Sequence, residues 1–326
     1  MNVIKNIGVL TSGGDAPGMN AAIRAVVRAA IYHQCRVFGI RCGYKGLIED
    51  QIEEMFSPSV SNILQTGGTL LKSARCLEFK LPEGRRKAYE NLKRHGIEML
   101  VVIGGDGTFR GAQELAEEYD LPVAGIPATI DNDISGTEYT IGYDTALNTI
   151  IEAVDKIRDT ASAHNRLFFI EIMGRDAGFL TLRSGIASGA EAVMIPELQN
   201  DEKKLRNFLE SSYKKTKTSS IVLVAEGDEV GGALRLAEKV QKEYPEYDVR
   251  VTILGHIQRG GSPSAFDRVS ASRMGVSAVE ALLRGEKNVM IGLINGQIAL
   301  TPLLKSVKEK KQLNRQLLEL LDILSI

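Results

Sequence analysis

Residues 99–119 read MLVVIGGDGTFRGAQELAEEY, and this stretch decides the fold. An apolar, largely β-branched run over Met99–Ile103 ends in two glycines, after which the residues follow a helical period as far as Tyr119. A buried strand that turns through glycine into a helix is typical of the βαβ units that build parallel sheets. The stretch therefore predicts an α/β fold.

Runs of the same kind recur along the chain and alternate with amphipathic helical stretches. No fixed repeat and no low-complexity linker interrupts them, so a tandem array of small modules is not expected. The predicted strands are Ile7–Leu10, Val37–Ile40, Leu100–Ile103, Val123–Ile126, Leu167–Ile172, Ala192–Ile195, Ile221–Val224, Val249–Leu254 and Val289–Ile294. At 326 residues the chain is long enough for two domains. The best boundary lies after Gly136, where a polar segment precedes a long helical pattern that starts at Ala146.

The composition excludes several classes of protein. There are 40 basic and 41 acidic residues, so no broad field attracts nucleic acid or an anionic membrane. The cysteines, Cys35, Cys42 and Cys76, form no CxxC pair, which argues against a disulfide framework or a zinc ribbon and favours reduced thiols. No apolar run reaches the roughly 18 residues of a membrane-spanning helix. We therefore expect a cytoplasmic chain that is neither secreted nor embedded in a membrane.

The first predicted strand is followed by TSGGDAPG at residues 11–18, directly before a helix that begins near Met19. Ligands of parallel α/β sheets bind beyond the carboxyl ends of the strands. Glycine lets backbone N–H groups approach phosphate oxygens, and the N-terminus of the helix adds the positive end of its dipole. The motif indicates a phosphate site, with an ordinary βα turn as the alternative.

The second motif, GGDGTFRG at residues 104–111, contains an acid in the same kind of turn. Because Asp106 would repel a bound triphosphate, its expected role is to face Mg²⁺. The spacing GxGxxxG only approximates a dinucleotide fingerprint. A Walker A motif is absent, because Leu71 stands where the glycine before Lys72 should be.

Two further strand ends carry polar residues. The segment PATIDND at residues 127–133 places two carboxylates and an amide after a buried strand, which favours a general base with a metal-shell acid over a capped turn. It lacks the glycine and distant glutamate of a calcium loop. The segment HIQRGGSP at residues 256–263 combines His and Arg, which suits a sugar phosphate. A structural histidine is the alternative there, and no zinc-binding spacing is present.

These motifs together carry a resemblance to a known family. The segments LTSGGDAPGMNAAIR, GGTLLKSAR, GGDGTFRGA, TIDNDISGT, IMGRDAG and LGHIQRGGSP occur in family order over essentially the whole chain, which thereby resembles the bacterial ATP-dependent 6-phosphofructokinases. The resemblance implies the phosphofructokinase fold, with two Rossmann-like three-layer αβα domains and mainly parallel sheets. It places ATP on residues 1–138 plus 254–302, and fructose 6-phosphate on residues 139–253 plus 303–326.

The implied reaction transfers the γ-phosphoryl group of MgATP to the 1-hydroxyl of fructose 6-phosphate, giving fructose 1,6-bisphosphate and ADP in the committed step of glycolysis. The implied catalytic residues are Asp131 as the base, Arg175 and Thr129, and Asp106 has the Mg²⁺ role. The implied ATP-binding residues are Gly14, Arg75, Cys76, Gly105, Asp106, Gly107 and Thr108. The implied sugar-phosphate residues are Thr129, Ile130, Asp131, Arg166, Met173, Gly174, Arg175, Glu226, Arg250, His256, Ile257, Gln258 and Arg259.

The resemblance also implies partners. Arg166 and Arg250 match arginines that family members contribute to a neighbouring subunit, which implies a homo-oligomer, usually a tetramer. An effector site for ADP or phosphoenolpyruvate would use Arg24, Arg28, Arg158, Gly189, Ala190, Glu191, Lys215 and Lys217. At Ser57 the family commonly has an effector-binding arginine, and losing such a contact, about 1.5–3 kcal/mol, would weaken regulation. A solvated helix face is the alternative for Arg24 and Arg28.

Three other functions compete with this one. Pyrophosphate-dependent relatives share the fold but typically carry Asp and Lys where this chain has Gly107 and Ala128, so we expect ATP as the donor. A dinucleotide-dependent oxidoreductase would leave TIDND and HIQR without roles. A catalytically idle binding subunit is disfavoured because Asp106, Asp131 and Arg175 are all retained.

Overall fold

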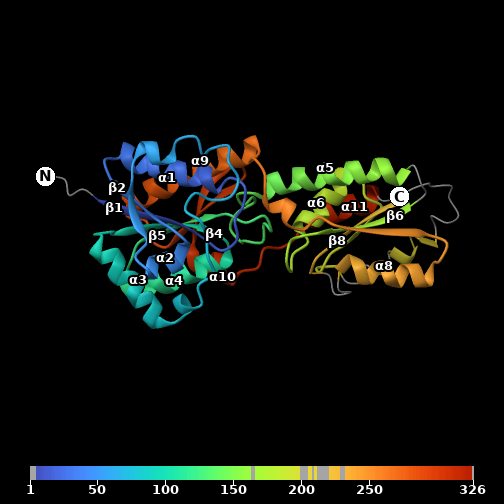
Figure 1. Cartoon of the computed structure of the whole chain (residues 1–326), viewed down its shortest axis with the longest axis horizontal. Coiled ribbons are helices and arrows are strands. Elements are labelled where there is room, and N and C mark those ends of the chain that lie inside the picture. Colours follow the sequence, from blue (N-terminus) through green and yellow to red (C-terminus); the bar gives the residue numbers. More distant parts are fainter. Residues whose placement is uncertain are drawn as a thin grey trace. The chain divides into compact units, whose positions relative to one another are not determined.

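A computed structural model describes residues 5–162, 166–198, 205–207, 209–210, 220–227 and 232–324 (Figure 1). The chain divides into two compact units. The first consists of Met1–Thr145 and Arg259–Lys311, and the second of Ala146–Gln258 and Gln312–Ile326. The ligand assigned above to each domain remains a prediction.

The first unit is built on a seven-stranded sheet in the order β11-β10-β5-β4-β1-β2-β3. The five central strands, β10, β5, β4, β1 and β2, pair with one another in parallel. The two edge strands, β11 and β3, each pair antiparallel with their single neighbour. The strands are β1 (Asn6–Ser12), β2 (Arg36–Ile40), β3 (Ile52–Met55), β4 (Met99–Gly104), β5 (Val123–Pro127), β10 (Val289–Ile294) and β11 (Gln297–Pro302).

Helices cover both faces of this sheet, so the unit has three layers. Figure 1 shows α1 and α9 on one face and α2, α3, α4 and α10 on the other. The buried core includes Leu10, Leu100, Phe109 and Met290 from the sheet and the helix layer. The helices are α1 (Met19–Tyr32), α2 (Gly43–Ile48), α3 (Pro82–Arg94), α4 (Asp106–Tyr119), α9 (Ala265–Leu283) and α10 (Leu303–Lys308), with short 3₁₀ turns η1 (Ser57–Val60) and η2 (Glu78–Lys80).

The second unit has a four-stranded parallel sheet in the order β7-β8-β6-β9. Figure 1 shows α5, α6 and α11 on one face and α8 on the other. Leu182 of α6 and Leu321 of α11 belong to one hydrophobic cluster, which holds the C-terminal helix in place. The elements are α5 (Tyr143–Ser162), β6 (Arg166–Ile172), α6 (Phe179–Ser188), β7 (Ala192–Met194), β8 (Ser220–Ala225), α8 (Gly232–Glu243), β9 (Asp248–Ile253), η3 (Gly255–Arg259) and α11 (Arg315–Leu324).

The α/β fold with mainly parallel sheets is confirmed, and every predicted strand is present. The edge strands β3 and β11 were not predicted. The β10–β11 hairpin turns at Asn295 and Gly296, which both have positive φ, as a two-residue Asn-Gly turn requires. That dipeptide between two apolar runs was a signal in the sequence for the missing strand.

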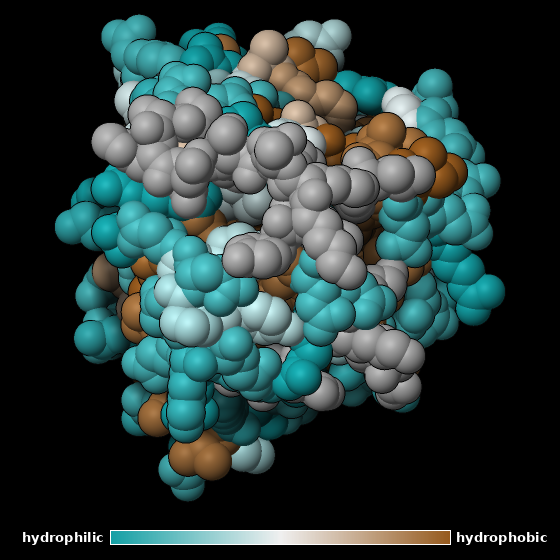
Figure 2. Space-filling view, turned by 90° about the vertical axis from the view of Figure 1, so that its right-hand side faces the viewer, coloured by the Kyte–Doolittle hydropathy of each residue, from teal (hydrophilic) through white to brown (hydrophobic). Residues whose placement is uncertain are grey.

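One face of the described residues is mainly hydrophilic. Figure 2 shows one face, on which hydrophilic residues predominate outside the atoms drawn in grey and hydrophobic residues gather in smaller groups. None of the helices in the described part of the chain is both long and apolar enough to span a bilayer.

Candidate active site

The ends of three adjacent strands of the first unit carry the predicted catalytic motifs. Parallel β1, β4 and β5 lie side by side, with Ser12 opposite Gly104 and Gly104 opposite Pro127. The Ala128 amide donates to the Gly104 carbonyl at 3.0 Å, which continues the pairing beyond the strands. The turns that contain Gly14, Asp106 and Asp131 therefore start at neighbouring positions on one sheet edge.

The turn between β4 and α4 is tightly packed against β1. The Thr108 hydroxyl donates to the Ser12 carbonyl at 2.9 Å. A β-carbon on Gly104 would stand 2.4 Å from both the Ser12 carbonyl oxygen and the Thr108 hydroxyl, so this position requires glycine. Because α4 begins at Asp106, the positive end of its dipole lies at this turn. The geometry suits an anionic ligand.

Gly14 of the first motif lies beneath an arginine. A β-carbon on Gly14 would stand 2.1 Å from Nη1 of Arg259, so the glycine makes room for that guanidinium. Nε of Arg259 is buried and has no hydrogen-bond partner in the part of the chain that the structure describes. Both residues belong to the first unit. A predicted sugar-phosphate residue thus lies against a predicted nucleotide residue.

Asp106 is the candidate metal ligand. Its side chain is 47% exposed in the first turn of α4, and Arg110 Nη2 lies 3.3 Å from Oδ2. Within the described residues no group of three His, Cys, Asp or Glu side chains could form an all-protein cage. Mg²⁺ is usually held by one or two carboxylates together with substrate phosphates. One accessible carboxylate at a turn that suits an anionic ligand therefore fits this ion.

Asp131 is only 3% exposed, and a local network fixes the turn that contains it. Its amide donates to the Thr129 hydroxyl at 3.2 Å. Asn132 has a positive φ of 52°, accepts from the Thr140 amide at 3.0 Å and donates to the Glu138 carbonyl at 3.0 Å. Asn132 is a supporting residue to which the sequence analysis gave no role of its own.

The loop that carries Arg75 and Cys76 is anchored to the first motif and to α1. Thr11 Oγ1 donates to the Lys72 carbonyl at 2.8 Å, and Ser73 Oγ donates to the Gly13 carbonyl at 2.7 Å. The buried Asn20 side chain donates to the carbonyls of Thr66 and Gly67 and accepts from the Leu70 amide. The predicted nucleotide residues of this loop are therefore held beside Gly13 and Gly14.

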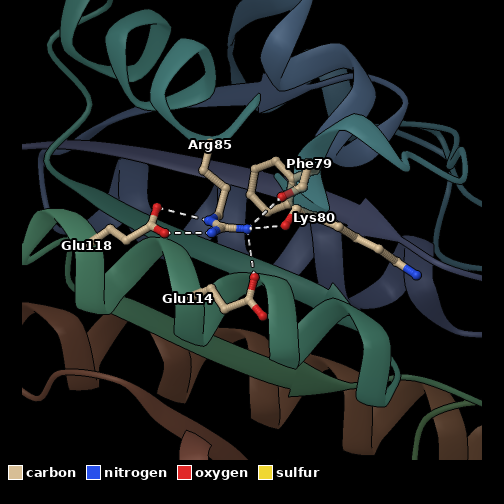
Figure 3. A network of polar contacts seen from close by, with 5 residues as sticks. All are labelled: Phe79, Lys80, Arg85, Glu114 and Glu118. Atoms are coloured by element: carbon tan, nitrogen blue, oxygen red, sulfur yellow. Dashed lines mark hydrogen bonds and ion pairs between the residues drawn. The ribbon is translucent and has the colours of Figure 1, made fainter. Parts of the chain in front are cut away.

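A buried arginine holds the end of this loop against α4 (Figure 3). Arg85 of α3 forms two hydrogen bonds with the Glu118 carboxylate, at 2.6 and 2.9 Å, and one with Glu114 at 2.8 Å. Its Nη1 also donates to the Phe79 and Lys80 carbonyls of η2. Hydrogen bonding to Glu118 raises the pKa of Arg85. The two glutamates compensate the positive charge of this buried side chain.

Tyr44 supports the same turn from α2. Its hydroxyl donates to the Thr108 carbonyl at 2.5 Å, and its ring stacks on Phe79 with centroids 3.9 Å apart. Burial raises the pKa of Tyr44, so the phenol stays neutral and remains a donor. The turn between β4 and α4 is thus supported on the side of the sheet that faces α2 and η2.

The second unit contains most of the predicted sugar-phosphate residues. Arg175 has a positive φ of 52°, and its amide donates to Glu226 Oε1 at 2.9 Å. Gln258 is fully buried and accepts from the Met173 amide at 3.0 Å, so its side chain supports the loop from within. His256 and Ile257 of η3 are exposed. Ile130, a sugar-phosphate residue predicted in the first unit, is only 2% exposed. It could contact a ligand only through its backbone.

The two arginines predicted to serve a neighbouring subunit converge on one carboxylate. Arg166 Nε lies 2.9 Å from Asp248 Oδ2, and Arg250 Nη1 lies 2.5 Å from Asp248 Oδ1. Arg166 pairs directly with Asp248 in the β6–β9 register. The shared carboxylate keeps the two guanidinium groups together as one cationic pair.

The predicted effector residues fall on both units. Arg24 is partly exposed and Arg28 exposed on α1 of the first unit. In the second unit Arg158 Nη2 donates to the carbonyls of Ser188 and Gly189, at 2.8 and 3.0 Å, while Nη1 lies 3.5 Å from Glu191. Lys215 and Lys217 lie outside the described residues.

Comparison with known proteins points to one family. A family model described as phosphofructokinase matches residues 6–282. The chain is 59% identical, over the full length of both proteins, to ATP-dependent 6-phosphofructokinase 2 of Bacteroides thetaiotaomicron. It is 55% identical over 323 residues, which are 99% of this chain and 100% of the relative, to ATP-dependent 6-phosphofructokinase 1 of Thermus thermophilus.

Solved structures agree with the sequence relatives. Phosphofructokinase from Saccharomyces cerevisiae matches with a TM-score of 0.87 and 39% identity, covering 93% of this chain and 45% of that chain. A pyrophosphate-dependent phosphofructokinase from Marinobacter aquaeolei matches with a TM-score of 0.84 and 22% identity, covering 96% of this chain and 86% of that chain. The second likeness supports the fold alone.

Proposed function

The chain belongs to the phosphofructokinase family, and we propose that it is an ATP-dependent 6-phosphofructokinase. It transfers the γ-phosphoryl group of ATP to the 1-hydroxyl of fructose 6-phosphate, which yields fructose 1,6-bisphosphate and ADP. As a kinase of glycolysis it acts on two anionic substrates, so positioning and charge stabilisation supply most of the acceleration.

One observation carries this proposal. A glycine-rich turn at the N-terminus of α4 and a nearly buried aspartate, Asp131, follow adjacent strands of one sheet. The first feature suits a nucleoside triphosphate and the second a general base, and kinases that phosphorylate a hydroxyl need both. A dinucleotide-dependent oxidoreductase would have no role for the Asp131 turn.

We assign the ATP site to the turns that contain Gly14 and Gly105–Thr108, with Arg75 and Cys76 supplied by the anchored loop. Backbone N–H groups of these turns and the dipole of α4 would hold the phosphates. Asp106 would hold Mg²⁺, which when bound supplies charge neutralisation on the phosphates. Thr108 keeps the turn in place through its bond to Ser12.

Asp131 accepts the proton of the 1-hydroxyl. The network around Asn132 holds the turn that carries this carboxylate, so little reorganisation of the turn is needed when the hydroxyl loses its proton. Thr129 orients the turn by accepting from the Asp131 amide. Arg175 stabilises the charge that develops on the transferred group.

The sugar 6-phosphate is bound by arginines that fork onto its oxygens. We assign this role to Arg166 and Arg250, acting on the site of a neighbouring copy, and to His256 and Arg259 on the chain's own site. The Arg166–Asp248–Arg250 cluster supports this assignment, because the two guanidinium groups lie together. The working enzyme is then a homo-oligomer, and we expect a tetramer.

Regulation and location are further parts of the proposal. The cluster of Arg158 and Glu191 would bind an effector such as ADP or phosphoenolpyruvate. This binding would be weakened because the chain has Ser57 in place of an arginine. The cytoplasm is the compartment that suits Cys35, Cys42 and Cys76, which are all free thiols.

A coupled assay of fructose 1,6-bisphosphate formation tests the proposal. It is run with ATP and with pyrophosphate as donors, and with or without ADP and phosphoenolpyruvate. We expect ATP-dependent activity that requires Mg²⁺. A protein that forms no fructose 1,6-bisphosphate with either donor would contradict the proposed function.

A further inference from the structure

Three side chains hold the loop that carries Arg175. The loop comprises residues 173–178 and is here called the MGRDAG loop. Backbone amides at its start, middle and end each donate to a side-chain oxygen from a different part of the second unit. The pairs are Met173 with Gln258 at 3.0 Å, Arg175 with Glu226 at 2.9 Å, and Gly178 with Glu197 at 2.9 and 3.1 Å.

The backbone conformation of the loop explains why such support is needed. Arg175 has a φ of 52°, which is unfavourable for a residue with a side chain. Such conformations persist only where the surroundings enforce them. Gly227 also packs closely on the loop, since a β-carbon there would stand 2.1 Å from the Arg175 carbonyl oxygen. The position of Arg175 therefore depends on the contacts that hold the loop.

Glu197 is the one residue of the three to which the predicted site assigns no role. It lies beyond the end of β7 and directs both carboxylate oxygens to the Gly178 amide, just before α6. A β-carbon on Gly178 would stand 2.5 Å from Ile195 Cβ and 2.7 Å from Glu197 Oε2, so the glycine permits this approach. A carboxylate at a helix N-terminus is also favoured by the helix dipole.

We propose that Glu197 is a positioning residue of the phosphoryl transfer, acting on Arg175 through the Gly178 amide and the MGRDAG loop. This inference rests on the proposed function. Glu197 secures the end of the loop next to α6, while Gln258 and Glu226 secure its start and middle. Loss of Glu197 frees that end, and Arg175 leaves the place from which it stabilises the transferred group.

The test compares Glu197→Ala and Glu197→Gln with a matched control, Glu171→Ala. Glu171 accepts from the Ala233 amide at 2.9 Å at the N-terminus of α8, so it makes the same kind of bond in the same unit. We expect Glu197→Ala to lower kcat/KM for fructose 6-phosphate about tenfold, while KM for ATP stays within about twofold. Glu197→Gln keeps an acceptor oxygen and should recover most of the loss. Glu171→Ala should keep wild-type kcat/KM.

Hydrogen exchange provides a second readout. The amide hydrogens of the peptide that covers the MGRDAG loop should exchange about tenfold faster in Glu197→Ala than in the wild type. In Glu171→Ala their exchange rate should equal that of the wild type. An active wild type with unchanged kcat/KM and exchange in Glu197→Ala would overturn this inference alone. Equal losses in Glu197→Ala and Glu171→Ala would overturn it too, because they would reflect stability and not position. A wild type that does not phosphorylate fructose 6-phosphate would overturn the proposed function as well.

Discussion

The guanidinium group of Arg259 lies over the backbone of Gly14, where a β-carbon would stand 2.1 Å from Nη1 and 3.1 Å from Cζ. The sequence alone suggested that this glycine admits a phosphate. The structure adds a second reason, because the glycine also admits an arginine from a segment distant in the sequence. The two residues are therefore expected to be energetically coupled.

A double-mutant cycle measures this coupling. Gly14 is not among the residues with positive φ, and the obstructing atoms are the flexible end of an arginine, so Gly14→Ala should fold normally. It should displace Arg259 and lower kcat/KM for fructose 6-phosphate at least tenfold. In an Arg259→Ala background the same change should cost less than about threefold. Equal losses in both backgrounds would show that the glycine acts on the nucleotide alone.

The role of Asp131 is tested by Asp131→Ser. A general base contributes about 10² to 10⁴ in rate, so kcat should fall by that factor. Binding of fructose 6-phosphate, followed by calorimetry, should remain within about threefold, because the turn keeps its bonds through Asn132. A variant that retains more than about a third of wild-type kcat would remove Asp131 from the base role.

The strands were predictable because each is encoded locally. An apolar run followed by glycine identifies a parallel strand in its own residues, and the turns that contain the predicted site residues follow directly from such runs. β3 and β11 lacked that pattern, because each pairs antiparallel at an edge of the sheet.

The supporting residues were not predictable for the opposite reason. Glu197 and Asn20 act through bonds to residues distant in the sequence, and so does Asp248 in its bond to Arg166. No local pattern around these residues marks the distant partner. Asp267 shows the same effect, since it accepts from the Gly142 amide 125 positions earlier. Such pairs become visible only when the fold brings the segments together.

Asp267 leads to a prediction about pH. It is fully buried, accepts from the amides of Gly142 and Thr145 and from the Thr145 hydroxyl, and lies near the charge of Asp144. Burial raises the pKa of Asp267 from 3.8 to about 6. Because the folded state holds this proton more tightly than the unfolded state, the stability from Asp267 is present below pH 3.8 and is lost as the pH rises through about 6.

The variant Asp267→Asn isolates this contribution. It keeps the size of the side chain but cannot ionise. Between pH 4 and 6 the wild type should lose stability relative to the variant by up to about 1.4 kcal/mol for each pH unit. Denaturant unfolding at equal protein concentration at several pH values measures the difference. A difference that does not change with pH would show that folding does not raise the pKa of Asp267.

The shared-site proposal predicts complementation. Arg166→Ser retains Asp131, and Asp131→Ser retains Arg166, so hybrid oligomers should contain some complete sites. Co-refolded mixtures of the two inactive variants should regain activity well above the sum of the separate preparations. Sedimentation of the active protein as a monomer, or activity equal to that sum, would contradict the contribution of Arg166 to a neighbouring copy.

The phosphoryl donor is tested at Gly107, where pyrophosphate-dependent relatives typically carry Asp. A β-carbon on Gly107 would meet no atom within 4 Å, so the fold accommodates Gly107→Asp without a clash. The new carboxylate would stand at the start of α4, beside Asp106, and would repel the α-phosphate of ATP. Ala128 is different, because it is 1% exposed and a lysine there would have to reach solvent from a buried position.

We therefore expect Gly107→Asp to lower kcat/KM for ATP at least tenfold, roughly 1.4 kcal/mol, with an unchanged unfolding midpoint. Gly107→Ala is the matched control, since it fills the same open space without charge and should stay within about threefold of the wild type. The decisive measurement is kcat/KM for ATP and for pyrophosphate in all three proteins. Equal losses in the two variants would make bulk, and not charge, the cause. A wild type that prefers pyrophosphate would show that Gly107 does not select the donor, although it would remain a phosphofructokinase.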